Sequence, residues 1–237
     1  MLIIVIRGLI VFLGPVGVGK STTIRVLSTV FSAKGIKVRV VFIKSFHGLS
    51  YLLWFFVSWF LSIPRGYAPW FLIPKLGYTR IGRILTVTSL YVDLLINIPI
   101  RLLLILLDRL FKFVTFSEEY IYSTLFDYIY SYSSLNIKSP LERLPLKVLL
   151  AIAVKYQPEY IIVLDAKINR IFERWSVRGY GDPQLKYALC LRWFLHRYLR
   201  ILASNSKIVV VDTTNLNIAD TVKAVIKAIG DLRHLTR

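Results

Sequence analysis

The residues with the clearest chemistry form the run Gly14-Pro15-Val16-Gly17-Val18-Gly19-Lys20-Ser21. It fits the phosphate-binding pattern G-x-x-x-x-G-K-[ST] at every fixed position. The glycines allow a tight turn whose backbone N–H groups face phosphate oxygens. Lys20 can reach the β- and γ-phosphates, and the Ser21 hydroxyl can bind Mg²⁺. The run therefore predicts a triphosphate and magnesium site whose binding residues are Gly14, Gly17, Val18, Gly19, Lys20, Ser21 and Thr22.

This chemistry requires a strand before the loop and a helix after it. Residues 9–13 are uniformly apolar and predict a buried strand, and a helical pattern begins at Ser21. The positive end of the helix dipole would then point at the phosphates. The order strand, loop, helix favours a true phosphate site over a chance glycine-rich turn.

Further apolar runs alternate with longer helical patterns, which is typical of a parallel α/β sheet. Strands are predicted at 36–43, 111–116, 160–164 and 207–211, and the last two are followed by Asp165 and Asp212. Ligands of such sheets bind at the carboxyl ends of the strands. We therefore expect an α/β, three-layer fold with a central, mostly five-stranded parallel sheet.

The balance of charged residues indicates which classes of binding partner the chain favours. Lys and Arg number 31 against 13 Asp and Glu, giving a formal charge of +18 on 237 residues. This balance favours polyanionic partners, although a solvated basic surface would give the same count. No recognition helix, zinc spacing or aromatic RNA-binding motif supports nucleic acid as the partner. The single cysteine, Cys190, excludes an intramolecular disulfide, and the wide separation of the three histidines argues against a zinc site.

The chain is also unusually apolar, with 56% hydrophobic residues and a mean hydropathy of +0.60. Residues 48–64 contain no charge and several aromatic residues, and 84–107 is almost as apolar. The first run is short for a bilayer and the second contains charges and Pro99, so core helices are favoured over membrane spans. Monotopic membrane contact or a hydrophobic partner groove stays open.

The apolar amino terminus lacks signal-peptide features, which favours a cytoplasmic protein with membrane association left open.

Several segments together resemble the thymidylate kinase family of P-loop nucleoside monophosphate kinases. Gly14–Thr22 matches that family's first loop. Tyr156–Asp165 is similar to its P-D-x-x-x-x-L-D strand, and Glu173–Gly179 to its E-R-x-x-x-R-G lid helix. The resemblance covers roughly 8–47 and 112–230. It implies one kinase-like domain, 1–237, with an apolar helical insertion or acceptor region at 48–110, between the second and third strands, and a lid at 167–182.

The resemblance also implies cofactors and site residues. ATP and Mg²⁺ would be bound, and Arg174 and Arg178, four residues apart on one helix face, would close over the donor phosphates. Phe116–Tyr120 resembles the D-R-[YFH] motif, so Glu118 takes the place of an aspartate that supports Mg²⁺ or the acceptor. The expected catalytic residues are Lys20, Arg174, Arg178 and Glu118, and the expected metal ligands are Ser21 and Glu118.

The acceptor half departs from the family pattern. Glu119 stands where the family has an arginine that helps to bind nucleotide phosphate. Lys44 and His47 replace an acidic, glycine-rich acceptor loop and are candidates for contact with an acceptor phosphate. The family's acceptor-binding arginine has no secure counterpart, although Arg101 is a candidate with Asp93 as a neighbour.

The function expected from these features is ATP- and Mg²⁺-dependent phosphoryl transfer to a nucleoside monophosphate, with dTMP as the first candidate. The alternative is a membrane-associated P-loop nucleotide-binding protein, or a kinase of a non-nucleotide or lipid-linked acceptor. Family members commonly pair, so a homodimer is a further expectation, and the exposed apolar helices would suit it.

Overall fold

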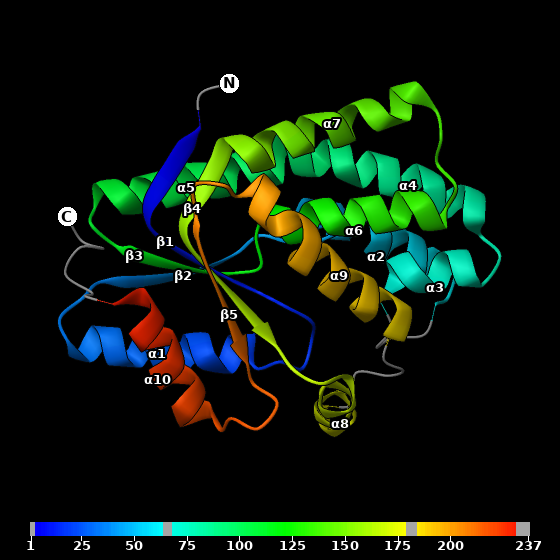
Figure 1. The fold of residues 1–237 in the computed structure, drawn as a ribbon. Helices are drawn as coiled ribbons and strands as arrows, with labels where there is room; N and C mark the ends of the chain where they lie inside the picture. Colours follow the sequence, from blue (N-terminus) through cyan, green and yellow to red (C-terminus); the bar gives the residue numbers. More distant parts are fainter. Residues whose placement is uncertain (1–2, 64–67, 179–183, 231–237) are drawn as a thin grey trace.

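Five parallel strands form the centre of the molecule. The computed structural model describes residues 3–63, 68–178 and 184–230. The strands lie in the spatial order β2-β3-β1-β4-β5, and every pairing is parallel (Figure 1). Their bounds are β1 Ile4–Leu13, β2 Val38–Phe42, β3 Val114–Glu118, β4 Tyr156–Asp165 and β5 Lys207–Asp212. The predicted parallel α/β fold is confirmed.

Alternating side chains of β1 build two cores, one on each face of the sheet. Leu9, Val11 and Leu13 belong to the larger hydrophobic cluster. Ile10 and Phe12 belong to the smaller one on the opposite face. Successive strand residues point to opposite faces, so a strand covered on both sides is apolar at every position. This explains why 9–13 carries no polar residue.

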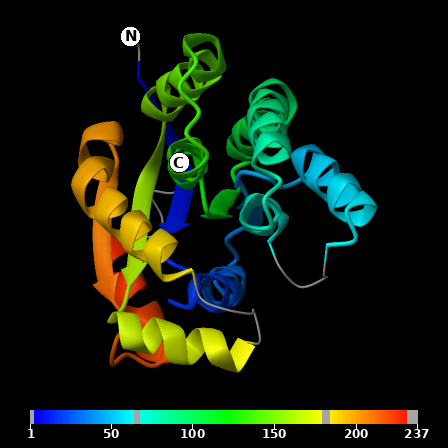
Figure 2. The ribbon, with the colours of Figure 1, turned by 90° about the vertical axis from the view of Figure 1, so that its right-hand side faces the viewer.

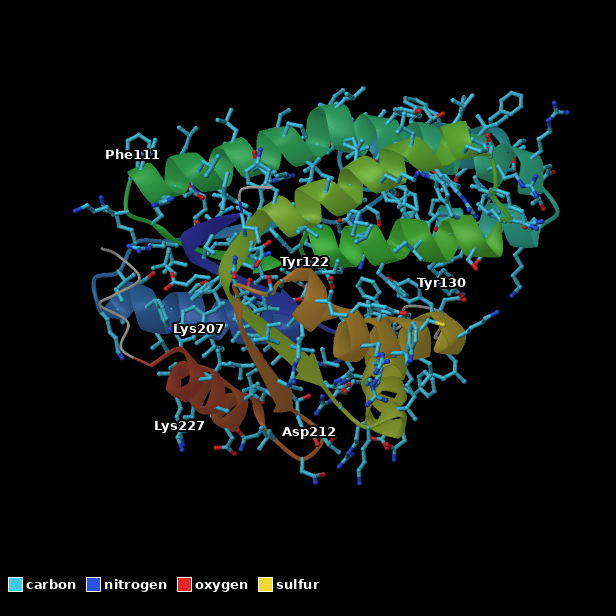
Figure 3. The ribbon with its side chains drawn as sticks, turned by 45° about the horizontal axis from the view of Figure 1, so that its top comes forward. Phe111, Tyr122, Tyr130, Lys207, Asp212 and Lys227 are labelled. Carbon is cyan, nitrogen blue, oxygen red and sulfur yellow. The ribbon has the colours of Figure 1, made fainter. Side chains whose placement is uncertain are left out.

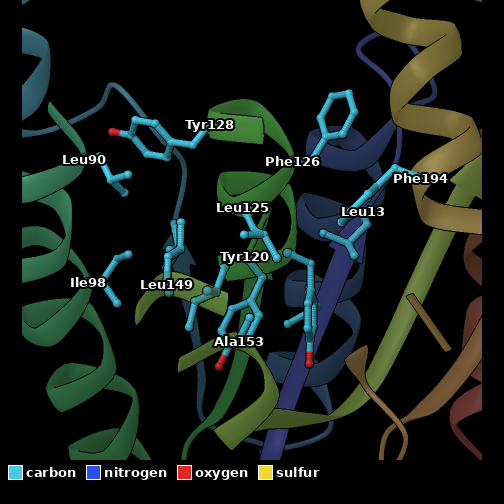
Figure 4. Packing of buried hydrophobic residues seen from close by; sticks show 14 of the residues in the cluster. Leu13, Leu90, Ile98, Tyr120, Leu125, Phe126, Tyr128, Leu149, Ala153 and Phe194 are labelled. Carbon is cyan, nitrogen blue, oxygen red and sulfur yellow. The ribbon is translucent and has the colours of Figure 1, made fainter. Parts of the chain in front are cut away.

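Helices cover both faces, which makes three layers (Figures 1 and 2). On the side of the smaller cluster, α1 (Lys20–Ala33) and α10 (Ile218–Ile229) contribute buried residues. The larger cluster receives residues from α6 (Ile121–Ser134), α7 (Pro140–Lys155) and α9 (Leu185–Leu202). Figure 4 shows side chains of this cluster from β1 and the surrounding helices packed together. The two cores hold the loop after β1 between layers.

The predicted insertion lies between β2 and β3 and consists of helices. They are α2 (Leu49–Phe60), α3 (Pro69–Lys75), α4 (Thr79–Val92), a π-helical turn η1 (Asp93–Asn97) and α5 (Ile98–Leu110). The last three form one continuous helix, Thr79–Leu110, of 32 residues. Among the described residues, this is the one helix long and apolar enough to cross a membrane by length and composition. It contributes Leu85, Leu90 and Ile98 to the larger cluster.

Several predicted strand boundaries were wrong. The third strand was expected at 111–116 but runs Val114–Glu118, because Phe111 follows α5 and is 66% exposed (Figure 3). Apolar character alone does not separate the end of a helix from the start of a buried strand. The first and fourth strands begin earlier than expected, and β1 changes register against β4 between Ile6 and Ile10. Gly8 in that interval has φ 74°, which accommodates the irregularity.

Candidate phosphate-binding and phosphoryl-transfer site

The loop after β1 is held tightly between β4 and α8 (Ile168–Arg178). Gly14 has φ 138°, and a Cβ there would lie 2.1 Å from the carbonyl oxygen of Leu164 in β4. A Cβ at Gly17 would lie 3.0 Å from the carbonyl oxygen of Ile171 in α8. Both positions therefore need glycine for space as well as for backbone conformation. The loop ends at Gly19, and α1 begins at Lys20.

Lys20 is folded into the loop and is only 6% exposed. Its Nζ atom donates to the carbonyl oxygens of Gly14 at 2.6 Å and Pro15 at 3.0 Å. It also forms an ion pair with Glu119 Oε1 at 3.1 Å. The predicted phosphate-binding lysine thus lies at the loop, with its charge neutralised by a carboxylate of the same chain.

Glu119 stands where the resembled family has an arginine, and the structure shows which charged groups surround its carboxylate. The side chain is 4% exposed, and its backbone has φ 66°, a conformation that costs energy for any residue other than glycine. Its Oε1 lies 3.1 Å from Lys20 and 3.8 Å from Lys44. Burial alone would raise the pKa of this carboxyl, but Lys20 and Lys44 together hold the pKa below its usual value. Glu119 is therefore an anion between two lysines.

The two predicted metal ligands, Ser21 and Glu118, are in direct contact. Ser21, on the first turn of α1, donates from Oγ to Glu118 Oε1 at 2.7 Å. Glu118 ends β3 and lies beside Phe12 in the sheet register, next to the start of the loop. A hydroxyl and a carboxylate are hard oxygen ligands that suit Mg²⁺, which usually takes few protein ligands and completes its shell with phosphate and water. The described residues contain no group of three His, Cys, Asp or Glu side chains that could hold a metal by themselves. The pair therefore fits a magnesium ion shared with a bound triphosphate.

The predicted lid helix lies against the same loop. The Arg174 guanidinium donates to Thr213 Oγ1 at 3.1 Å and to the Thr213 carbonyl oxygen at 2.8 Å. Thr213 follows β5, so this contact ties α8 to the carboxyl edge of the sheet. The side chain of Arg178 and residues 179–182 of the predicted lid lie outside the described residues. Arg174 is thus placed near the loop, and the prediction for Arg178 stays a prediction.

A cavity of about 520 Å³ opens between the loop, α8 and the segment from β5 to α10. Its size is in the range of small-ligand sites. The loop residues Gly17, Val18 and Gly19 form one wall, and Arg174 and Thr213 lie at another. The rest of the lining is apolar or carries hydroxyl groups, apart from the polar side chains of Glu173 and Asn217, and comprises Thr22, Thr23, Val177, Leu216, Ile218 and Thr221. A flat, mostly apolar group attached to a phosphate at the loop would fit between these walls.

On the other side of Lys20, a second buried cluster surrounds Lys44. Its Nζ lies 3.8 Å from both Glu119 and Asp127. Burial alone would lower the pKa of Lys44, but the attraction of Asp127 and Glu119 outweighs it and raises the pKa. The hydroxyl groups of Ser45 and Tyr187 both donate to Asp127. This cluster joins the end of β2 to α6 and α9.

Sequence reasoning missed Asp127 and Tyr187. Asp127 is the only charged residue of α6. A single carboxylate in such a helix is a signal that the sequence analysis could have used. Tyr187 gave no comparable signal. The other acceptor candidates lie differently: His47 Nδ1 is 2.7 Å from the Ser45 carbonyl oxygen, and Arg101 is exposed on α5. Asp93 is buried in η1, where Tyr128, Asn97 and the Phe46 N–H donate to it.

The two aspartates that end β4 and β5 also differ from each other. Asp165 is buried, accepts a hydrogen bond from Arg192 Nη2 at 2.9 Å, and forms ion-pair contacts with Arg192 Nε at 2.8 Å and His196 Nε2 at 3.0 Å. Asp212 is exposed and accepts from the backbone and hydroxyl of Thr214. Asp165 therefore fixes α9 to the sheet edge beside the loop, and Asp212 shapes the turn that carries Thr213.

Comparisons with known proteins agree with this geometry at the level of the fold. No protein-family model and no curated protein matches the sequence. Among solved structures, the chain is similar to thymidylate kinase from Candida albicans, with a TM-score of 0.52 and 15% identity over 94% of this chain and 91% of that one. It is also similar to deoxyadenosine kinase from M. mycoides with bound dCTP, with a TM-score of 0.57 and 13% identity over 93% of this chain and 98% of that one. The fold is that of P-loop nucleotide and nucleoside kinases, and the resemblance stated from the sequence is confirmed at that level.

Proposed function

We propose that the protein is a kinase that uses ATP and Mg²⁺ to phosphorylate a nucleoside monophosphate, with dTMP as the first candidate acceptor. One observation carries the proposal: Lys20 and Ser21 at the start of α1, Glu118 at the end of β3 and Arg174 of α8 meet at the loop that follows β1. Phosphoryl transfer depends on positioning and on neutralising phosphate charge, and this is the set of groups it requires. The fold shared with two nucleotide and nucleoside kinases supports the proposal.

Each residue has a defined task in this scheme. Backbone N–H groups of the loop bind phosphate oxygens, and Lys20 leaves Glu119 to contact the terminal phosphates. Ser21 and Glu118 would hold Mg²⁺, which when bound neutralises charge on the donor phosphates. Arg174, now bonded to Thr213, turns toward the phosphates as charge develops there. The donor base would bind in the cavity between α8 and the start of α10.

A second acceptor class is favoured by the cluster around Lys44. Two buried carboxylates, Glu119 and Asp127, flank this single lysine. A phosphate on the acceptor would be repelled by them, whereas the uncharged hydroxyl of a nucleoside would not. A carboxylate could also accept the proton of an attacking hydroxyl. A nucleoside is therefore the second candidate acceptor.

A transfer assay with γ-labelled ATP separates these possibilities. The purified protein is incubated with Mg²⁺ and a panel that pairs each nucleoside monophosphate with its nucleoside, including dTMP and thymidine. Label in a diphosphate product supports the monophosphate acceptor, and label in a monophosphate product supports the nucleoside. Measurable ATP binding without transfer to any member of the panel would contradict the proposed kinase activity.

A further inference from the structure

The carboxyl end of α2 forms an apolar groove with the start of α4. The groove measures about 440 Å³ and is lined by Phe56, Val57, Trp59, Phe60, Leu61 and Ile81. These six residues are called the aromatic tip below. Trp59 is 74% exposed and Phe60 is 82% exposed. Large aromatic side chains at this exposure are unusual on the surface of a soluble domain, and together they mark an interaction site.

The sequence of α2 explains why the apolar surface is exposed. Its twelve residues carry no charge, and only Ser50 and Trp54 are buried in the molecule. Trp54 packs edge-on against Phe46 and donates from Nε1 to Ser89 Oγ at 2.9 Å. A surface helix normally places polar residues opposite its buried stripe. Here the opposite face is also apolar, and Figure 2 shows α2 along the outer edge of the helical layer, away from the sheet.

The charges around the aromatic tip all have one sign. Between residues 43 and 117 the only acidic residues are Asp93 and Asp108, and each is 1% exposed. Lys75 at the end of α3 and Arg80 at the start of α4 are exposed, and Arg80 directly precedes Ile81 of the groove. The insertion therefore presents apolar and cationic groups to solvent without an exposed carboxylate among its described residues.

We propose that the aromatic tip docks the protein onto an anionic membrane surface. Aromatic side chains, above all tryptophan, are favoured at the boundary between lipid headgroups and acyl chains. Nearby Lys and Arg gain from the negative potential of acidic lipids, and exposed carboxylates would oppose it. The charge complementarity distinguishes such a surface from an apolar face made only for a protein partner.

The contact is peripheral because the long helix beside the aromatic tip is tied into the fold. Asp93 accepts from Tyr128 of α6 at 2.5 Å and from Asn97 at 2.6 Å. Asp108 pairs with Arg39 of β2 at 2.6 Å. Moving α4 and α5 into a bilayer would break both anchors and expose buried carboxylates to hydrocarbon, which is strongly unfavourable. Only the exposed tip of the insertion enters the interface.

Vesicle flotation of the full chain tests the proposal. The vesicles contain phosphatidylcholine alone or with phosphatidylglycerol, and the test variant is Trp59→Ser/Phe60→Ser. The matched control is Leu141→Ser/Leu144→Ser, which removes two exposed apolar residues from α7. Thermal unfolding of each variant confirms that these surface changes leave the fold intact. A third variant, Lys75→Glu/Arg80→Glu, tests the charge.

We expect the wild type to float with the anionic vesicles and not with the neutral ones. The Trp59→Ser/Phe60→Ser and Lys75→Glu/Arg80→Glu variants should each lose binding by about tenfold or more, while the α7 control binds as the wild type does. Equal binding by wild type and tip variant overturns the proposal. It is also overturned if the wild type does not bind vesicles and the tip variant instead dissociates a dimer in light scattering, because the occupant is then a second copy. Vesicle binding does not depend on kinase activity, so the two proposals fail independently.

Discussion

Among single residues, Lys20 has two competing anionic partners, namely the Glu119 carboxylate and the phosphates of a bound donor. In the structure its charge is paired with Glu119 at 3.1 Å, yet the proposed reaction requires the same charge at the donor phosphates. Glu119 and the donor phosphates are both anionic, so the Glu119 carboxylate neutralises Lys20 as a phosphate would. Glu119 thereby lowers the net positive charge that the loop offers to ATP.

The first prediction follows from this competition. In Glu119→Gln the carboxylate charge is gone, and Lys20 and Lys44 attract phosphate without opposition. We expect ATP to bind about three- to tenfold more tightly, which corresponds to roughly 1 kcal/mol. Isothermal titration of wild type and variant measures it, with Glu142→Gln, a glutamate in the first turn of α7 that does not line the cavity at the loop, as the control. Weaker ATP binding by Glu119→Gln would contradict the competition.

The same variant carries a pH-dependent cost in stability. The pKa of Glu119 is lowered in the folded protein, so its ionised form stabilises the fold at pH values above its usual pKa of 4.5. That contribution is lost as the pH falls through the lowered pKa. We expect Glu119→Gln to lose roughly 2 kcal/mol of unfolding free energy near neutral pH, and the difference from wild type to shrink below 4.5. Chemical denaturation across pH measures both, and a difference independent of pH would contradict the assignment.

The pair of Ser21 and Glu118 yields the third prediction. Glu118→Gln keeps the size of the side chain and removes the charge that would hold Mg²⁺. We expect the Mg²⁺ concentration needed for half-maximal activity to rise by about tenfold or more, with a smaller change in the ATP KM. Titration of activity with Mg²⁺ at saturating ATP checks this. An unchanged Mg²⁺ dependence would exclude Glu118 from the metal site.

At the scale of elements, the loop depends on close packing between β4 and α8. Gly14 and Gly35 both have positive φ, at 138° and 75°, but a Cβ at Gly14 would lie 2.1 Å from Leu164 O, and one at Gly35 would meet nothing within 4 Å. Gly35→Ala should therefore cost only the backbone strain, about 1 kcal/mol. Gly14→Ala should cost about 3 kcal/mol or more, because β4 must also shift. Thermal unfolding compares them, and equal losses would mean that the loop does not pack as described.

The helical insertion is anchored at Asp93, within its π-helical turn. This carboxylate accepts from Asn97, Tyr128 and the Phe46 N–H, so Asp93→Ala leaves two buried donors, the Tyr128 hydroxyl and the Phe46 N–H, without this acceptor, while Asn97 still donates to the His47 carbonyl oxygen. We expect a loss of about 2 to 4 kcal/mol. Glu173→Ala, at an exposed glutamate of α8, is the control and should change stability by less than about 0.5 kcal/mol. Similar values for the two variants would show that the turn is not an anchor.

The elements also show what the sequence could and could not predict. The strand, loop and helix around Lys20 were predictable because glycine, lysine and hydroxyl positions are fixed by one local geometry. The parallel fold followed from apolar runs. The start of β3 was misplaced, because Phe111 is as apolar as the strand that follows it. The cluster at Lys44 depends on Asp127 of α6 and Tyr187 of α9. The contact between these two helices could not be predicted from the residues that neighbour either one in the sequence.

At the scale of the whole molecule, two regions have different characters. In the proposed reaction the donor binds beside the loop, α8 and the start of α10, where the predicted residues Lys20, Ser21 and Arg174 lie. The acceptor would then bind on the side of the Lys44 cluster and the insertion, which holds buried carboxylates and an exposed apolar end. The formal charge of +18 then suits both an anionic nucleotide and, in the proposal above, an anionic membrane.

In the proposed function, phosphoryl transfer from ATP depends on the positive charge of Lys20 at the loop. The most direct measurement is the rate of γ-phosphoryl transfer from labelled ATP, in the presence of Mg²⁺ and the best acceptor of the panel, by wild type and Lys20→Ala. Lys34→Ala, an exposed lysine that follows α1, is the matched control. We expect Lys20→Ala to lose about a hundredfold or more in kcat while remaining folded, and Lys34→Ala to keep the wild-type rate. Equal kcat for wild type and Lys20→Ala would contradict it.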